Sequence, residues 1–125
     1  WRDEAAARRE IAAFLQNEAA IATAWQEIVA ASRRGDATFE QLAGRIETDI
    51  TDSYERSFEH LSHMPVSPAL PSGAQLDQLR DYAARRRDAS RLLAEGLRDG
   101  DAKKVQAAMA LERKSRLPGA EDKTP

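Results

Sequence analysis

Residues 62–73 read Ser-His-Met-Pro-Val-Ser-Pro-Ala-Leu-Pro-Ser-Gly and form the main interruption in this chain of 125 residues. Pro65, Pro68 and Pro71 each lack a backbone N–H, and each biases the residue before it away from helical geometry. The sequence on both sides is rich in Ala, Arg, Glu, Leu and Gln, which lose little free energy on entering a helix. The prolines therefore divide the chain into two helical halves.

Upstream of the break, apolar residues recur at alternating four- and three-residue steps from about Arg2 to Arg34. This spacing predicts an amphipathic helix, and Gly35 can end it in the left-handed conformation. The inward seam consists of Ala7, Ile11, Phe14, Glu18, Ile21, Trp25, Ile28 and Ser32, widened by Leu15, Ala22 and Val29. Because this helix is longer than its expected partners, we expect its first turns, from Trp1 on, to project beyond the others.

A second helix is predicted from Thr38 to about His63. Thr38 and Gln41 have the spacing of a capping box, in which each side chain bonds the backbone N–H of the other residue. Its inward positions are Phe39, Leu42, Ile46, Ile50, Tyr54, Phe58 and Leu61. Their mean spacing is close to the helical repeat, which predicts an apolar stripe that runs almost straight along the helix.

After the break, Ser72 and Gln75 repeat the capping-box spacing at the start of a third helix, whose end is bracketed by Gly96 and Gly100. Its inward residues are Leu76, Leu79, Ala83, Leu93 and Leu97, with Tyr82 and Ala89 flanking.

Asp101 can cap a shorter fourth helix that Pro118 and Gly119 end. The apolar residues of this helix are Val105, Ala108, Met109 and Leu111.

Two helical hairpins joined by a proline-rich connector predict an all-α fold, an up-and-down four-helix bundle with a long first and a short last helix. Residues 1–119 then form one domain, made of hairpin 1–63, connector 64–72 and hairpin 73–119, and residues 120–125 form a flexible tail. The alternative is a three-helix bundle with the last helix loosely docked.

Composition narrows the class of protein. An apolar content of 42% is typical of a domain with a single core. No apolar run in the sequence is long enough to span a membrane. The sequence contains no Cys, which excludes disulfides and thiolate chemistry. Residues 1–63 carry 7 basic and 12 acidic groups and residues 64–125 carry 12 and 9, so net charges of −5 and +3 favour docking of the two halves. The isoelectric point of about 5.7 argues against nucleic acid as a partner.

Catalytic motifs are missing from the sequence, which has no Gly-x-Ser-x-Gly, phosphate loop, His-Glu-x-x-His or Cys nucleophile. We therefore expect no enzyme activity and no cofactor. His60 and His63 lie on adjacent helical turns near Glu55 and Glu59, and Glu59 and His63 have a spacing that can hold a metal. Two solvated histidines at a helix end are the favoured interpretation, and no metal site is predicted.

Polar residues interrupt the apolar seams at Glu18 in the first helix and at Arg86 and Ser90 in the third. We favour the interpretation that these residues fix helix register or lie at the seam edge, because burying a charge is costly unless it is well bonded. The alternative is a pocket for a small polar ligand, lined by Glu18 and Arg86. Trp25 and Tyr82 are further candidates for ligand or interaction contacts.

Three segments carry a resemblance to a known family: Leu42-Ala-Gly-Arg-Ile-Glu-Thr-Asp-Ile50, residues 79–89, and Gly96-Leu-Arg-Asp-Gly-Asp101. They resemble helical extramembrane regions that follow the last membrane span in some bacterial rhomboid-family intramembrane proteases. The resemblance implies a tethered accessory domain, and it transfers no catalytic residue because the rhomboid serine motif and membrane histidine have no counterpart here.

We therefore expect a non-catalytic interaction or regulatory domain from a bacterial membrane-anchored protein, on the extracytoplasmic side, with a membrane tether upstream of Trp1. A protein partner or a homodimer is expected. The Gly-Asp turn before the last helix is also similar to extracytoplasmic four-helix sensor domains of chemoreceptors, so a ligand-sensing receptor domain is the alternative function.

Overall fold

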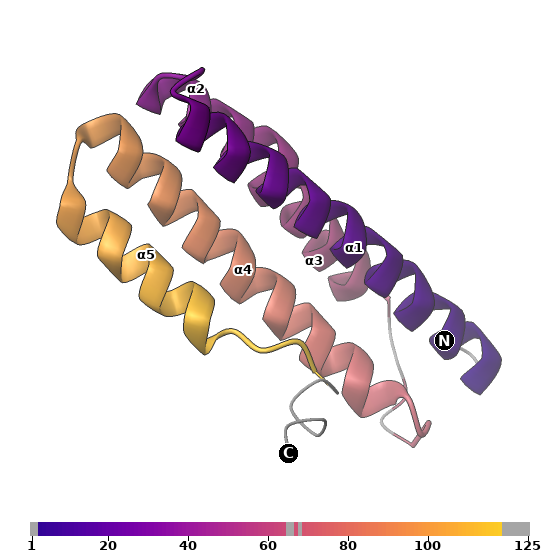
Figure 1. Ribbon diagram of the computed structural model, residues 1–125. Coiled ribbons are helices and arrows are strands. Elements are labelled where there is room, and N and C mark those ends of the chain that lie inside the picture. The colour runs from indigo at the N-terminus through magenta and orange to yellow at the C-terminus, as the bar shows by residue number, and fades with distance from the viewer. Residues whose placement is uncertain (1–2, 65–66, 68, 119–125) are drawn as a thin grey trace, which may run out of the picture.

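The computed structural model describes residues 3–64, 67 and 69–118. Its helical elements are α1 (Glu4–Arg34), α2 (Phe39–Ile46), the π-helical turn η1 (Glu47–Thr51), α3 (Asp52–Ser62), α4 (Gly73–Asp99) and α5 (Ala102–Lys114). Because α2, η1 and α3 follow one another without a break, the described residues form four helical rods and contain no strand (Figure 1). The predicted all-α four-helix bundle is confirmed.

Helix α1 begins at Glu4, where the Asp3 carboxylate accepts a hydrogen bond of 2.7 Å from the backbone N–H of Ala6. It ends at Gly35, whose φ of 72° is the left-handed conformation predicted for this position. The prediction that the first turns project is wrong from Glu4 onward, because Ala7 is completely buried and Glu4 binds Ser72 at the start of α4. Trp1 lies outside the described residues.

The second rod begins with the predicted capping box. The Thr38 backbone N–H donates to Gln41 Oε1 at 2.9 Å, and the Gln41 N–H donates to Thr38 Oγ1 at 3.1 Å.

The π-helical turn η1, in the middle of this second rod, was not predicted, yet the sequence explains it. Ile46, Ile50 and Tyr54 follow at four-residue steps, which drift around a helix of 3.6 residues per turn, and the wider π turn brings all three inward.

The α4–α5 hairpin differs from its prediction at the start. Ser72 makes no side-chain cap bond, so the expected Ser72–Gln75 capping box is absent. The Glu4 carboxylate accepts the Ser72 backbone N–H in place of Gln75 and also accepts the hydroxyl proton. Ser72 moreover has helical φ and ψ angles of −90° and −1°, not the extended conformation from which an N-cap side chain accepts.

The other end of the hairpin follows the prediction. Gly100 ends α4 with a φ of 64°, and the Asp101 carboxylate caps α5 by accepting bonds from the N–H groups of Lys103 and Lys104. Helix α4 runs through Gly96, where a Cβ would lie only 2.9 Å from both the backbone N and Cγ2 of Val105. The missing side chain at Gly96 therefore permits the close approach of α5.

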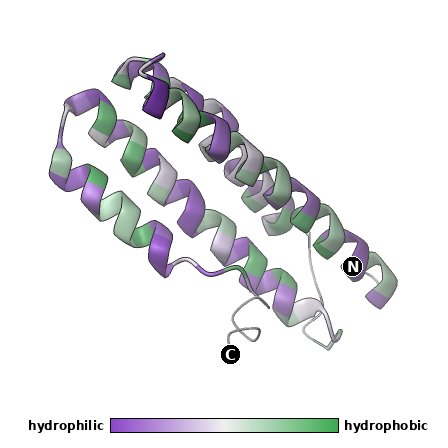
Figure 2. Ribbon diagram, in the orientation of Figure 1, coloured by the Kyte–Doolittle hydropathy of each residue, from purple (hydrophilic) through white to green (hydrophobic). Residues whose placement is uncertain are grey.

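The core lies between α1, the second rod and α4, and apolar residues recur along every helix (Figure 2). Tyr82 and Ala89, predicted only to flank the seam of α4, are fully buried. Several residues predicted to face inward are instead exposed: Leu15, Ala22, Val29, Ser32, Phe39, Met109 and Leu111. The reason is that α5 packs on α4 alone. No Cα atom of α5 comes within 8 Å of one in α1 in the described part of the chain, so these two helices do not pack closely on each other.

Candidate functional site

A polar network lies inside the bundle around Glu18, and we call it the Glu18 network: Glu18, Tyr54, Tyr82, Arg86 and Glu112. The hydroxyl of Tyr54 donates to Glu18 Oε1 and that of Tyr82 donates to Oε2. Arg86 Nη1 in turn donates to the Tyr82 hydroxyl oxygen at 2.7 Å. These contacts join α1, α3 and α4 through hydrogen bonds that leave neither oxygen of Glu18 without a partner.

Arg86 extends the network to α5. Its Nε lies 2.8 Å from Glu112 Oε2, an ion pair in which the N–H makes no hydrogen bond. Its guanidinium carbon also lies 5.3 Å from the ring centre of Tyr54 and 5.6 Å from that of Tyr82, within cation–π range. Oε1 of Glu112 is buried and has no hydrogen-bond partner in the described part of the chain, so the network is incomplete at α5.

Burial sets the protonation states of this network. It raises the pKa of Tyr54 and that of Tyr82, so both phenols stay neutral donors at physiological pH. Burial opposes the charge of Arg86, but Tyr54 and Glu112 beside it raise its pKa overall, so it stays a cation. Burial also raises the pKa of Glu112, against the opposing effect of Arg86. The raised pKa of Glu112 means that this carboxylate loses its charge at a higher pH than an ordinary glutamate does.

The structure brings three of the four predicted site residues together, namely Glu18, Tyr82 and Arg86. Trp25 lies two helical turns beyond Glu18 on α1 and belongs to a different surface. Sequence reasoning missed Tyr54 and Glu112. Two tyrosines in buried seams should have indicated an internal acceptor, because buried phenols need a partner. Glu112 follows the buried Ala108 by four residues, a spacing that turns it to the same inward face.

A hollow of about 320 Å³ opens between α1 and α5 at the α2 end of the bundle, and we call it the α1–α5 groove. It is lined by Trp25, Ile28, Val29, Ser32, Arg33, Phe39, Leu42, Ile46, Leu93, Leu97 and Met109. Three of the five large hydrophobic residues that are exposed in the described chain line it: Val29, Phe39 and Met109, at 43%, 61% and 50% exposure. The exposed apolar surface is thus concentrated at one site.

Beyond Phe39 the groove adjoins a second hollow of about 330 Å³ at the α4–α5 turn. The two hollows share Phe39 and Leu97. The rest of the second hollow is lined by the small or apolar residues Gly96, Gly100, Ala102 and Val105 and by the polar residues Asp101 and Gln106. Within the groove, the indole N–H of Trp25 is buried and makes no hydrogen bond with any described residue. Apart from Ser32, Arg33 and this indole, the groove offers only apolar side chains.

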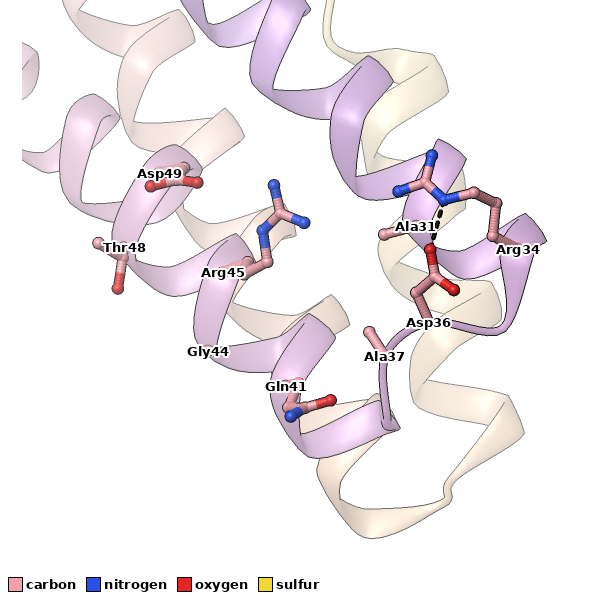
Figure 3. A pocket seen from close by; sticks show the side chains of 9 residues that line it. All are labelled: Ala31, Arg34, Asp36, Ala37, Gln41, Gly44, Arg45, Thr48 and Asp49. Atoms are coloured by element: carbon pink, nitrogen blue, oxygen red, sulfur yellow. Dashed lines mark hydrogen bonds and ion pairs between the residues drawn. The ribbon is translucent and has the colours of Figure 1, made fainter.

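A larger and shallower hollow of about 660 Å³ lies beside the α1–α2 turn (Figure 3). Both of its arginines are already engaged, because Arg34 pairs with Asp36 and Arg45 lies 3.8 Å from Glu27. The hollow therefore offers no uncommitted cation for an anionic ligand among the residues that line it.

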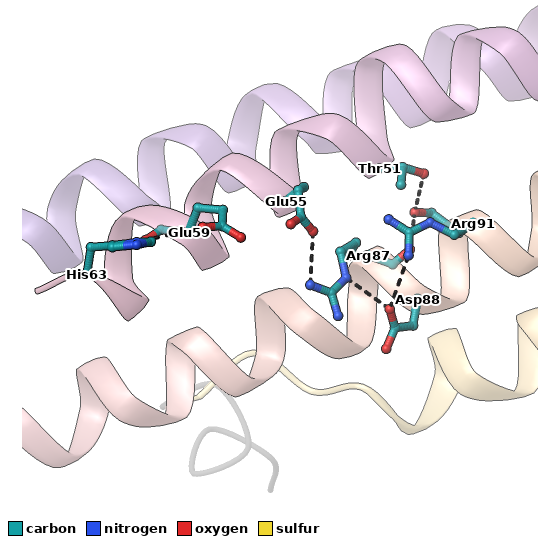
Figure 4. A network of polar contacts seen from close by, with 8 residues as sticks. Thr51, Glu55, Glu59, His63, Arg87, Asp88 and Arg91 are labelled. Carbon is teal, nitrogen blue, oxygen red and sulfur yellow. Dashed lines mark hydrogen bonds and ion pairs between the residues drawn. The ribbon is translucent and has the colours of Figure 1, made fainter.

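The interface of α3 with α4 carries an ion-pair network (Figure 4). Glu55 on α3 is directed toward Arg87 on α4, which it meets at 2.9 Å, and Arg87 also pairs with Asp88. The guanidinium of Arg87 lies 4.8 Å from the ring centre of Phe58. Arg87 is thus used for contacts inside the bundle.

His60 and His63 each lie beside a different glutamate. His60 Nε2 lies 2.8 Å from Glu10 on α1, and His63 lies 3.7 Å from Glu59. Among the described residues, no group of three or more His, Cys, Asp or Glu side chains is arranged to hold a metal ion.

Comparison of the chain with protein-family models, with curated proteins and with solved structures finds no match. The resemblance to rhomboid-family extramembrane regions therefore stays a prediction that rests on the three sequence segments alone. None of the helices in the described residues has the length and apolar composition of a membrane span.

Proposed function

We propose that this chain is a non-catalytic interaction module, a helical bundle that binds a partner protein through the α1–α5 groove. The observation that carries the proposal is the concentration of Val29, Phe39 and Met109 in one groove. Apolar surface removed from water contributes roughly 25 cal/mol per Å², and a contiguous exposed apolar patch is typical of a binding surface.

We further propose, from the resemblance of residues 42–50, 79–89 and 96–101, that the module is an extramembrane part of a bacterial membrane-anchored protein such as a rhomboid-family protease, on the extracytoplasmic side. Any catalysis would then reside outside this bundle. The test is fractionation of cells that make the full-length protein. Recovery with membranes and release by detergent, but not by salt, supports the tether, and recovery in the soluble fraction rejects it.

Ligand sensing through Glu18 and Arg86 is the less favoured function. Both oxygens of Glu18 accept hydrogen bonds from tyrosines, and Arg86 is engaged by Tyr82 and Glu112. A ligand would have to displace these internal contacts, whereas a partner at the α1–α5 groove displaces only water.

Site-specific photo-crosslinking in the source organism tests the interaction module. Benzoylphenylalanine is introduced in place of Phe39, in the groove, and in place of Arg85, an exposed residue on α4 that serves as the matched control. A discrete crosslinked species from position 39 that is missing from position 85 supports the proposal. Its loss when Val29→Asp is added assigns the contact to the groove, and equal crosslinking from both positions rejects it.

A further inference from the structure

The occupant of the α1–α5 groove can be inferred from its shape, its lining and its charge, on the premise that the groove is the binding surface proposed above. Its sides are two helices whose backbones do not approach within 8 Å, and its base comes from α2 and α4. A helix laid along the groove would pack against both sides and cover Val29 and Met109, in the manner of amphipathic helices that fill hydrophobic grooves.

An extended peptide fits this surface poorly. The described residues contain no strand, so the groove has no sheet edge with which an extended backbone could pair. A helix satisfies its own backbone hydrogen bonds and can present only apolar side chains to an apolar lining. The groove thus favours a helical occupant.

The charge at the α1–α5 groove is positive. No Asp or Glu lines it, and Arg33 is its one charged residue. Arg113 follows Met109 by four residues and so lies on the same face of α5, one turn further along. Neither arginine makes a hydrogen bond or an ion pair within the described residues, unlike Arg34, which pairs with Asp36. Two uncommitted guanidinium groups on opposite sides of the groove select carboxylates on the partner.

Among the described residues, the two longest helices of a second copy, α1 and α4, do not supply such a helix. The exposed face of α1 carries no charge along Ala12, Leu15 and Ala19, and the exposed face of α4 alternates acidic and basic residues such as Asp81 and Arg85. Neither face combines an apolar stripe with flanking carboxylates. Charge complementarity therefore points away from self-association through the groove.

We propose that the α1–α5 groove binds an acidic amphipathic helix of a partner protein, with its apolar stripe over Val29, Phe39 and Met109 and its carboxylates toward Arg33 and Arg113. The proposal deepens the proposed function by fixing the secondary structure and the charge of the partner segment.

The experiment uses Trp25 as reporter. The chain has two Trp residues, so Trp1→Phe leaves Trp25, which lines the groove, as the one indole. The probe is a synthetic helical peptide of about 18 residues with leucines at i, i+4, i+7 and i+11 and flanking glutamates. The control peptide has the same leucines with lysines in place of the glutamates. Protein variants are Arg33→Glu and, as matched control, Arg85→Glu, both at exposed positions of helices.

We expect saturable quenching or shift of Trp25 fluorescence by the acidic peptide, with the lysine peptide binding at least about tenfold more weakly. Arg33→Glu should weaken the acidic peptide by about tenfold and strengthen the lysine peptide, while Arg85→Glu changes neither. Circular dichroism of each variant checks that the fold is retained. Equal binding of both peptides would overturn the charge assignment while leaving the groove as a helix-binding surface.

Other outcomes separate this inference from the proposed function. If neither peptide binds but position 39 crosslinks to a partner, the helical occupant is wrong and the interaction module stands. If neither peptide binds and no crosslink forms, both are wrong. Tighter binding of dodecanoate than of the acidic peptide would make the occupant a small amphipathic anion. Self-association in sedimentation that Phe39→Asp abolishes would make it a second copy.

Discussion

Thr51 Oγ1 on η1 and Ser90 Oγ on α4 lie 2.7 Å apart, and both side chains are buried. Ser90 donates its single hydroxyl proton to the carbonyl oxygen of Arg87 at 2.9 Å, so Thr51 is the donor of the shared bond. The π-helical turn ends at Thr51 and turns it inward. This hydroxyl pair fixes the second rod against the middle of α4.

The hydroxyl pair can be tested by a double-mutant cycle. Ser90→Ala leaves the Thr51 hydroxyl buried without this acceptor and should lower the free energy of unfolding by about 1–3 kcal/mol. Thr51→Val leaves Ser90 bonded to Arg87 and should cost about 1 kcal/mol. The double variant should cost less than the sum, because no unpaired hydroxyl remains. Urea unfolding measures all three, and additivity within about 0.5 kcal/mol would show that the two side chains do not interact.

Glu18 is expected to be essential for stability because it is the shared acceptor of two buried phenols. Glu18→Ala leaves the hydroxyl protons of Tyr54 and Tyr82 without their acceptor, while the Tyr82 oxygen keeps its bond from Arg86. The expected loss is about 3 kcal/mol or more in the free energy of unfolding, typical of a broken buried network. Glu27→Ala, on the exposed side of the same helix, is the control and should cost less than about 1 kcal/mol. A small effect of Glu18→Ala would mean that water replaces the carboxylate.

The rods and several of their ends could be predicted because local rules determine them, although α5 ends at Lys114 and not at the predicted Pro118–Gly119 stop. The capping box at Thr38, the left-handed Gly35 and the cap at Asp101 each need only neighbouring residues, and all three are confirmed. The Ser72 cap failed because the competing acceptor, Glu4, is 68 residues away in sequence. Local spacing carries no information about such a contact.

The site was predictable only in part for the same reason. Helical spacing predicted that Glu18 and Arg86 face inward, but it carries no information about which side chains they contact. In the structure, Glu18 is hydrogen-bonded to Tyr54 and Tyr82 and not to Arg86. The α1–α5 groove was missed because periodicity assigns every apolar residue to a core. Val29 and Met109 are exposed because α5 packs on α4 alone, and that arrangement is a tertiary property.

Gly96 should be the least tolerant glycine among those whose neighbours the structure defines. A Cβ at Gly96 meets the backbone of Val105 at 2.9 Å, which cannot move aside without shifting α5, so Gly96→Ala should destabilise the hairpin by about 1–3 kcal/mol. Gly44 is the matched control, since it is helical and a Cβ there meets nothing within 4 Å. Gly44→Ala should stabilise by about 0.5–1 kcal/mol. Thermal unfolding of both variants checks the opposite signs, and a stabilising Gly96→Ala would refute the close α4–α5 contact.

Acidic residues in this bundle should respond to pH in opposite directions. Hydrogen bonds from Ser72 lower the pKa of Glu4, and a hydrogen bond from Arg98 lowers that of Glu47. Their stabilising contribution is present above the unfolded pKa of about 4.5 and is lost as pH falls through the lower folded pKa. Glu112 is the reverse, because burial raises its pKa in the folded state. Its contribution is present below the unfolded pKa and is lost as pH rises through the folded pKa.

The Glu112 contribution can be isolated by subtraction, using Glu112→Gln, which keeps the shape but cannot titrate. The free energy of unfolding of the wild-type chain minus that of the variant should fall as pH rises from 4.5, because the folded state holds the Glu112 proton more tightly than the unfolded state does. Glu4, Glu47 and the other carboxylates are common to both proteins and cancel. Urea unfolding at successive pH values from acid to neutral gives the difference curve. A difference that rises with pH would mean that Arg86 stabilises the Glu112 carboxylate more than burial destabilises it, and Glu112 would then be a permanent ion-pair partner.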